Sequence, residues 1–453
     1  MALAIAGIAA ARLIRERRRE ALKRGVVLVD HGGVRHVRRR RNRPCAAAPS
    51  RLVLAGRVVP YTDEAKHFKM IGATGSGKST AIRELLSGAL ARGDRAIIAD
   101  PDAGYQAGFF KRYRGDVILN PFEPRSVKWD PFSELRHAYD AEHLAASLIP
   151  CGEDAAANEW RAYARTFLGA VLAHCRRTEH AAAEELWRLL SIAPVAELRD
   201  VVAGTAAQPF LDPDNGRMFG SIRSVAVSAA AALEHVAAQR AAPFSVRHWV
   251  RGGRGPGALF ITYRAGQIAA LRAMIAAWMR LAIFETMDGA ENHDQRLWFV
   301  IDELDALGAI AGLKDALARL RKFGGRCVLG FQSIAQVSGT YGAADAQTIV
   351  ENCGNTLILR CSGSETGGTS QFASRLIGER EIVRRQISRG SDRGGSLAAG
   401  GVRRSRNVGD QHVTEAAVMA SQIEQLPDLC GYWKSASSPE WRMVHLRARP
   451  PHA

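Results

Sequence analysis

A glycine-rich stretch at residues 72–80 has the residue types and spacing of a phosphate-binding loop. Glycines at 72, 75 and 77 let the backbone curl with its N–H groups pointing inward, and a helical pattern follows at once. An apolar run precedes the loop, so strand, loop and helix come in the order that a P-loop requires. We expect Lys78 to contact the outer phosphates of a nucleotide and Ser79 to hold Mg²⁺. The predicted nucleotide contacts are Gly72, Thr74, Gly75, Ser76, Gly77, Lys78, Ser79 and Thr80.

Two carboxylates, Asp302 and Glu303, directly follow the apolar run Leu297 to Ile301. A buried strand ending in such a pair is typical of the second half of a P-loop nucleotide site. We expect Asp302 to orient Mg²⁺ through water and Glu303 to polarise the attacking water as general base. Because many buried strands end in aspartate, this prediction depends on the P-loop upstream.

Gln332 closes another apolar run, Cys327 to Phe331. A glutamine at the end of a core strand beside the P-loop strand is well placed to sense the γ-phosphate of ATP. The alternative is that Gln332 caps the helix that follows it.

Short apolar runs and a long helical stretch indicate an α/β fold with a mainly parallel sheet and an inserted all-helical domain. The runs Arg95 to Asp100 and Val117 to Asn120 are typical of buried parallel strands. Residues 134–239 are rich in Ala, Leu, Glu and Arg at helical spacing. The predicted division is an apolar stub with a basic juxtamembrane arm at 1–43, the nucleotide-binding domain at 44–133 and 246–446, and the helical domain at 134–245.

Two segments carry nearly all of the formal charge of +17. Residues 12–43 hold thirteen Arg or Lys against three acidic residues, and residues 375–406 hold nine against three. Basic arms on a nearly neutral body suit polyanions such as nucleic acid, or an anionic membrane surface. The alternative is that each run is only a solvated tail. Seven scattered cysteines without a Cys-x-x-Cys pair disfavour a zinc site or a disulfide framework.

The first 11 residues are apolar and uncharged, about half of the roughly 20 residues that span a bilayer. Arginines follow this run instead of preceding it, which argues against a signal peptide. A short amphipathic anchor and the last turns of a transmembrane helix both remain open. We further expect a few small strands at 25–60 and a mobile Gly/Ser-rich segment at 389–401.

With these motifs in place, the chain resembles the conjugative type IV secretion coupling proteins, the TraD-like ATPases. The likeness spans about residues 50–446. The stretches that carry it are Lys66 to Thr80, Asn158 to Arg161, Ile301 to Leu304, Arg321 to Gly325, Gly330 to Ser333 and Ser421 to Tyr432. The P-loop is common to many ATPases, whereas the Arg-Lys-Phe-Gly-Gly stretch and the tail are more specific.

This resemblance implies a RecA-like core, ATP and Mg²⁺ as cofactors, and a hexamer at the cytoplasmic face of the bacterial inner membrane. It implies pumping of relaxase-bound single-stranded DNA toward type IV secretion channel proteins. Arg321 would reach the neighbouring subunit's site as an arginine finger, with Arg326 as the competing candidate. Family members usually begin with two transmembrane helices, and here at most a fragment of one precedes residue 12.

Two other functions are compatible with the same motifs. One is a motor for double-stranded DNA of the segregation or packaging type, which predicts stimulation by duplex. The other is a non-catalytic receptor or scaffold that tethers a relaxase–DNA complex and uses nucleotide only as an assembly switch. An intact Lys78 and Glu303 disfavour the second, because a switch can dispense with a general base.

Overall fold

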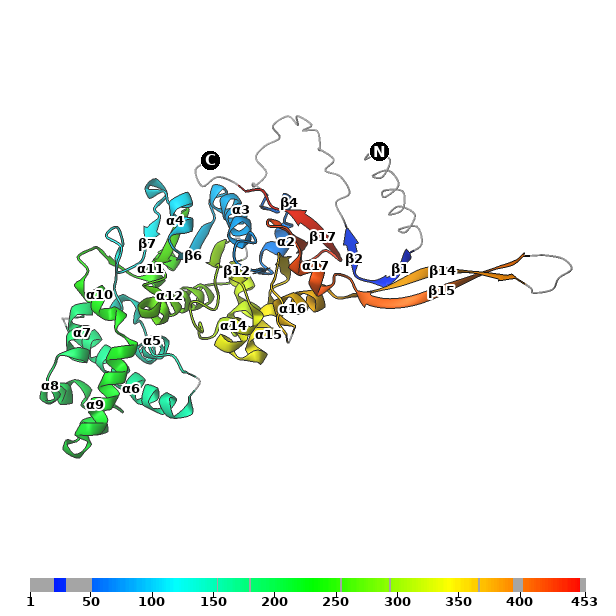
Figure 1. The fold of residues 1–453 in the computed structure, drawn as a ribbon. Coiled ribbons are helices and arrows are strands. Elements are labelled where there is room, and N and C mark those ends of the chain that lie inside the picture. The colour runs from blue at the N-terminus through cyan, green and yellow to red at the C-terminus, as the bar shows by residue number, and fades with distance from the viewer. Residues whose placement is uncertain are drawn as a thin grey trace.

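A ten-stranded sheet forms the centre of the molecule in the computed structural model (Figure 1). The structure describes residues 20–29, 51–152, 154–178, 181–252, 255–292, 295–365, 367–393 and 402–448. The predicted stub and most of the basic arm at 1–43 therefore lie outside the described residues. Within the described part, no helix is both long enough and apolar enough to cross a bilayer.

The sheet is parallel from β13 to β7 and becomes mixed only at its other end, where β16 runs antiparallel to both β13 and β17. The last pair, β17 and β2, is parallel again. The P-loop strand β5 is separated from the Asp302 strand β11 by β12 alone. Both motifs therefore emerge at the same, carboxyl edge of the sheet. In spatial order the strands are β2 (Val27–Val29), β17 (Glu440–His445), β16 (Cys430–Lys434), β13 (Asn355–Ile358), β5 (Phe68–Ile71), β12 (Gly325–Phe331), β11 (Leu297–Ile301), β6 (Arg95–Pro101), β10 (Gly257–Tyr263) and β7 (Val117–Ile118).

Helices cover both faces of this sheet, and its central strands are mostly apolar because both faces are buried. In β6, Ala96 and Ile98 pack into one hydrophobic cluster while Ile97 and Ala99 pack into the other. The first cluster includes α3 (Lys78–Ala91), the helix that follows the P-loop. The second includes α12 (Ile268–Met287), α13 (Leu313–Arg319), α14 (Ile334–Tyr341), α15 (Ala343–Asn352) and α16 (Gly368–Ile377). Shorter elements are α2 (Tyr61–Glu64), α4 (Gly104–Phe109) and α17 (Ala420–Glu424).

A group of helices forms one end of the molecule, as predicted for an insertion (Figure 1). The chain leaves and re-enters the core through β8 (Lys128–Trp129) and β9 (Pro243–Phe244), which pair in parallel. Buried Glu134 joins the two crossings, since it accepts hydrogen bonds from the N–H groups of Val246 and Arg247. The helices of this group are α5 (Asp140–Leu148), α6 (Ala155–Arg177), α7 (Ala183–Ser191), α8 (Val195–Val202), α9 (Gly216–Ala229) and α10 (Ala232–Ala238). α11 (Val246–Gly252) follows β9, where the chain has returned to the core. The predicted fold class, an α/β core with a mainly parallel sheet and a helical insertion, is confirmed.

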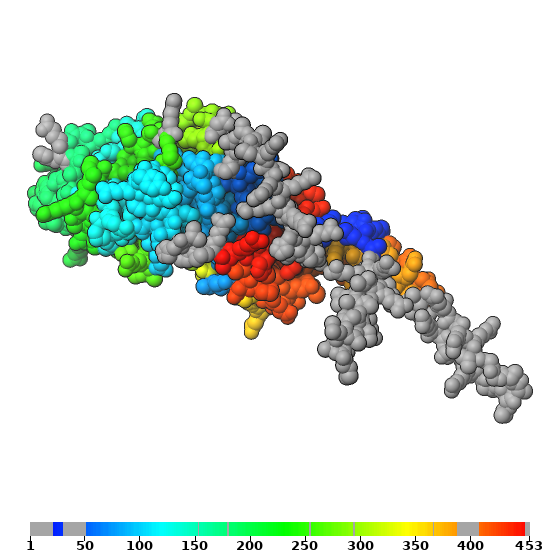
Figure 2. Space-filling model, turned by 90° about the horizontal axis from the view of Figure 1, so that it is seen from above, coloured from blue at the N-terminus to red at the C-terminus, as the bar shows by residue number. Residues whose placement is uncertain are grey.

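A long hairpin projects from the end of the sheet opposite to the helices (Figure 1), and Figure 2 shows its base, in orange, beside the blue N-terminal strands. It consists of β14 (Glu379–Arg393) and β15 (Val402–Ala416), with β1 (Glu20–Gly25) added along β14. Residues 389–393 of the segment predicted to be mobile form regular antiparallel pairs with β15, a strand that was not predicted there; residues 394–401 lie outside the described residues.

Of the small strands expected at 25–60, one pair forms a separate hairpin and another strand joins the main sheet. β3 (Val53–Leu54) and β4 (Arg57–Val58) form a hairpin of their own. In contrast, β2 joins the main sheet beside β17, and β1 joins the long hairpin.

Candidate active site

The loop between β5 and α3 has the backbone shape that its glycines predict. Gly75 and Gly77 have φ angles of 75° and 116°, values that favour glycine. A Cβ at Gly77 would also lie 2.9 Å from the Leu429 side chain, so the loop is closely packed as well as sharply turned. The first N–H groups of the 14-residue helix α3 face the same side, which makes this end of the sheet a favourable place for an anion.

Lys78 is the buried cation of this loop. Its Nζ atom donates hydrogen bonds to the carbonyl oxygens of Gly72, at 2.6 Å, and Ala73, at 3.2 Å. Burial lowers the pKa of Lys78, while the charges of Asp302 and Glu303 oppose that shift. The acidic pair predicted to work with the P-loop is therefore close enough to interact with its lysine.

Asp302 lies directly against the P-loop helix. Its Oδ2 atom accepts a hydrogen bond of 2.7 Å from Ser79 Oγ and another of 2.7 Å from Tyr105 Oη. Two motifs that are 223 residues apart in sequence thus share a hydrogen bond. The contact follows from the strand order, because β5 and β11 end at the same edge of the sheet.

The second oxygen of Asp302 supports a cation site at this place. Asp302 is buried, with 4% of its surface exposed, and its Oδ1 atom has no hydrogen-bond partner among the described residues. A buried carboxylate oxygen without a partner is costly unless another group satisfies it. The Ser79 hydroxyl and the Asp302 carboxylate supply oxygen donors, which Mg²⁺ prefers. The residues present therefore fit the predicted metal.

Glu303 and Gln332 are connected to the P-loop by a chain of hydrogen bonds. The Gln332 amide donates from Nε2 to Glu303 Oε1 at 3.1 Å, and its Oε1 atom accepts from Thr74 Oγ1 at 2.7 Å. Partial burial and the neighbouring Asp302 raise the pKa of Glu303. Gln332 thus contacts both the loop and the acidic pair. Its side chain does not cap the helix that follows, which was the alternative.

A pocket of about 200 Å³ brings most of the predicted contacts together. Gly72 and Ser76 shape the loop from behind: Gly72 accepts from Lys78, and the Ser76 hydroxyl donates to the Ala73 carbonyl at 2.7 Å. The residues that line the pocket are Thr74, Gly75, Gly77, Lys78, Ser79, Thr80, Asp302, Glu303, Gln332 and Leu429.

Leu429 and Tyr105 belong to the site but were not predicted from the sequence. The Leu429 N–H donates to the Ser76 carbonyl at 2.9 Å, so the C-terminal segment closes one side of the P-loop. The stretch 421–432 carries part of the family resemblance, but nothing in its sequence indicates that it packs beside the P-loop. For Tyr105, the only sequence signal is that it follows the end of a predicted strand at Asp100.

The two arginines proposed as fingers lie at the opposite, amino edge of the sheet. Arg321 is exposed on the short 3-10 helix Leu320–Phe323, just before β12 begins. Arg326 is 2% exposed, and its Nη1 atom donates to the carbonyls of Gln295 and Gly324 at 3.0 and 2.7 Å. Because Arg326 is enclosed in its own subunit, it is a poor candidate for a residue that reaches a neighbour. Arg321 does not contact the pocket of its own chain.

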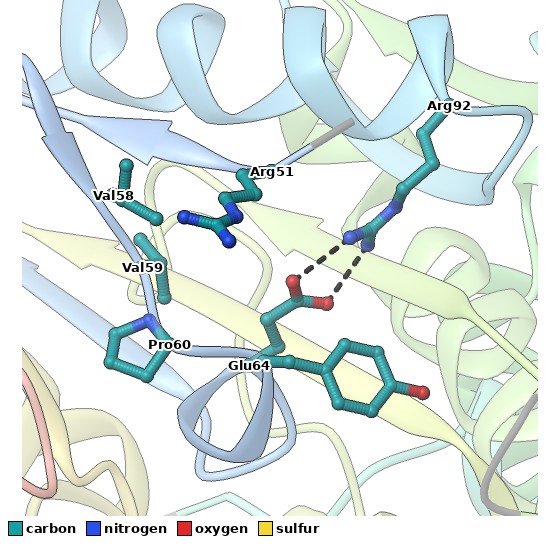
Figure 3. A pocket seen from close by; sticks show the side chains of 7 residues that line it. Arg51, Val58, Val59, Pro60, Glu64 and Arg92 are labelled. Carbon is teal, nitrogen blue, oxygen red and sulfur yellow. Dashed lines mark hydrogen bonds and ion pairs between the residues drawn. The ribbon is translucent and has the colours of Figure 1, made fainter. Parts of the chain in front are cut away.

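A second pocket, of about 420 Å³, does not have the chemistry of a phosphate site (Figure 3). Glu64 lies on its wall with both carboxylate oxygens bound to Arg92, at 2.9 and 2.8 Å. Arg92 also pairs with Asp94, so the acidic and basic groups satisfy each other. The wall has no glycine-rich loop, and the nucleotide prediction therefore rests on the P-loop pocket alone.

The family model and the curated relatives that match the chain all describe conjugative transfer or type IV secretion proteins. Residues 51–446 match the family model of the type IV secretion-system coupling protein DNA-binding domain. Coupling protein TraD of Escherichia coli K12 is 30% identical over 378 residues, which cover 82% of this chain and 51% of TraD. The chain thus spans about half the length of the curated relatives it matches.

Solved structures of plasmid coupling protein TrwB have the same fold over nearly their full length. One, in complex with a non-hydrolysable ATP analogue, is 30% identical with a TM-score of 0.79 and 95% of each chain covered. Another, in complex with ADP and Mg²⁺, is 31% identical with a TM-score of 0.76, covering 89% of this chain and 90% of TrwB. The described fold is therefore similar to that of proteins crystallised with nucleotide.

Proposed function

Because the chain belongs to the family of type IV secretion-system coupling proteins, we propose that it is an ATP-driven DNA translocase. It would deliver a relaxase-bound single strand to a type IV secretion channel. The observation that carries the proposal is the contact of the P-loop with the acidic pair, with one oxygen of Asp302 left without a partner. Relatives crystallised with an ATP analogue, or with ADP and Mg²⁺, support ATP and Mg²⁺ as cofactors.

Each residue of the pocket has a separate role in ATP hydrolysis. The P-loop amides and Lys78 bind the phosphates and offset the charge that develops on them. Ser79 and Asp302 would hold Mg²⁺, which supplies charge neutralisation when bound. Glu303 accepts a proton from the attacking water, and its raised pKa makes it a stronger base than an exposed glutamate. Gln332, bonded to both Thr74 and Glu303, senses the γ-phosphate and links it to the base.

The proposed assembly is a hexameric ring in which each pocket is completed by Arg321 of the next subunit. Arg321 is exposed and lies at the edge of the sheet opposite to its own P-loop, which suits a role in trans. Loss of the γ-phosphate would then move one subunit against its neighbour and carry DNA with it. As part of the same proposal, the helical domain is residues 134–245 and the ring lies at the cytoplasmic face of the inner membrane.

Mixed rings test the role of Arg321. Neither Arg321→Ala nor Lys78→Ala protein should hydrolyse ATP, since each lacks one half of every shared site. A mixture should regain turnover, because some interfaces pair an intact P-loop with an intact finger. Turnover is measured across mixing ratios, with Arg319→Ala, a neighbouring exposed arginine, as the matched control. Mixed rings that form but stay inactive would contradict a role in trans.

Turnover of ATP with different DNA ligands tests the function itself. We expect single-stranded DNA to stimulate hydrolysis more than duplex of equal nucleotide content. Stimulation should weaken steeply as the salt concentration rises, because basic side chains that bind DNA phosphates displace the cations condensed on the DNA. Stronger stimulation by duplex would favour the double-stranded motor. Very slow turnover that is indifferent to DNA would favour the scaffold.

A further inference from the structure

A hydroxyl group from outside both nucleotide motifs holds the carboxylate of Asp302. Tyr105 is 1% exposed, and its Oη atom donates to Asp302 Oδ2 at 2.7 Å. The same oxygen accepts the hydrogen bond from Ser79. Two donors therefore share one oxygen of this carboxylate, while the other oxygen has no partner among the described residues.

The fold fixes Tyr105 in this place through the end of the neighbouring strand. β6 pairs with β11, with Ala99 opposite Ile301, so Asp100 and Asp302 follow at adjacent strand ends. Asp100 is fully buried and accepts hydrogen bonds from the N–H groups of Tyr105, at 2.9 Å, and Gln106, at 2.7 Å. The first turn of α4 is thereby anchored beside the Asp302 strand.

The short connection before α4 is bent to make this contact. Asp102 and Ala103 both have positive φ angles, 54° and 56°. Such angles are uncommon outside glycine and persist where the surroundings hold them. The hydrogen bonds that Asp100 accepts supply that restraint.

The ring of Tyr105 meets the P-loop helix on its other side. The Arg83 guanidinium of α3 lies over it, 5.3 Å from the ring centre. Tyr105 thus touches α3 with its ring and Asp302 with its hydroxyl. Removal of the hydroxyl alone leaves the ring in place, which separates the hydrogen bond from the packing.

We propose that Tyr105 is a positioning residue for Mg²⁺ at this site, an inference that rests on the proposed function. The hydrogen bonds from Tyr105 and Ser79 to Oδ2 fix the rotation of the carboxylate. The free Oδ1 atom is therefore held in one orientation, ready to accept from a water on the metal. Carboxylate χ2 torsions are otherwise broad, so loss of one donor lets the group turn. Groups that orient metal ligands in this way typically change metal affinity by 10- to 100-fold when removed.

The test is to measure how the affinity of the Tyr105→Phe protein for fluorescently labelled ADP depends on the Mg²⁺ concentration. Mg²⁺ should raise this affinity, and we expect the Mg²⁺ concentration that gives half of the increase to be about 10-fold higher than in the wild type. ADP affinity without Mg²⁺ should be unchanged, and excess Mg²⁺ should restore ATP turnover. The matched control is Tyr113→Phe, which removes a hydroxyl from a tyrosine that is 85% exposed. Melting temperatures of both variants report whether the fold is retained.

Each other outcome has a definite meaning. A Tyr105→Phe protein with the wild-type Mg²⁺ midpoint would overturn the inference and leave the proposed function standing. Weaker ADP binding without Mg²⁺ would also overturn it, since Tyr105 would then support the loop and not the metal. Wild-type protein that binds no nucleotide at any Mg²⁺ concentration would overturn both.

Discussion

Lys78→Ala is expected to reduce ATP turnover by roughly 10²- to 10³-fold or more, the range seen when a preorganised charge or donor at a reacting group is removed. Lys78 is the buried cation of the pocket, and its Nζ atom already interacts with the acidic pair. Its loss removes the positive charge that offsets the charge developing on the phosphates. Steady-state phosphate release with saturating single-stranded DNA measures the effect.

The same substitution also breaks two hydrogen bonds from Nζ to the loop carbonyls, so folding has to be checked separately. Lys111→Ala is the matched control, because Lys111 is exposed and does not line the pocket. A folded Lys78→Ala protein with turnover near that of the control would remove the assignment of this pocket as the hydrolytic site.

Glu303→Gln is expected to bind ATP with nearly normal affinity and to hydrolyse it roughly 10²- to 10⁴-fold more slowly, the contribution typical of a general base. The glutamine keeps the shape of the side chain, and its carbonyl oxygen can still accept the bond from Gln332 Nε2. Only the proton-accepting charge is removed. Equilibrium binding of labelled ATP and single-turnover hydrolysis, measured on the same preparation, separate the two effects.

Asp305→Asn is the control for Glu303→Gln, since it removes a nearby carboxylate that does not line the pocket. Its turnover should stay close to that of the wild type. If Glu303→Gln loses ATP binding, and its hydrolysis falls only as much as its ATP binding does, Glu303 would have a structural role instead.

The parts of the site predicted from the sequence are those encoded over a few consecutive residues. The P-loop carries its own turn, glycines and helix start, and the acidic pair follows an apolar strand directly. Because parallel strands end at one edge of the sheet, the two motifs meet, and Asp302 accepts a hydrogen bond from Ser79. Gln332 was predicted from its place at the end of a core strand beside the P-loop strand, and its bonds to Thr74 and Glu303 agree with that prediction.

The parts that were missed depend on contacts between distant segments. Tyr105 meets Asp302 only because β6 lies next to β11 and the loop at 102–103 bends back. Leu429 reaches the P-loop only because β16 adds to the far side of β13. Neither strand order nor loop geometry is encoded in the few residues around these positions.

The pairing of β14 with β15 could not be predicted from composition. The Gly and Ser content of residues 389–401 suggested a mobile segment, whereas residues 389–393 pair one by one with the return strand. Strand formation depends strongly on the partner strand, which a local window does not contain. For the same reason, β2 was expected ahead of the core and instead extends its sheet.

The most direct test of the central claim is displacement of streptavidin from single-stranded DNA biotinylated at either end, followed over time with ATP. We expect wild-type protein to release streptavidin from one end in preference to the other. Release should stop with a non-hydrolysable ATP analogue and in Glu303→Gln. Equal release without hydrolysis, or steady ATP hydrolysis with no release from either end, would contradict a motor that moves along a single strand.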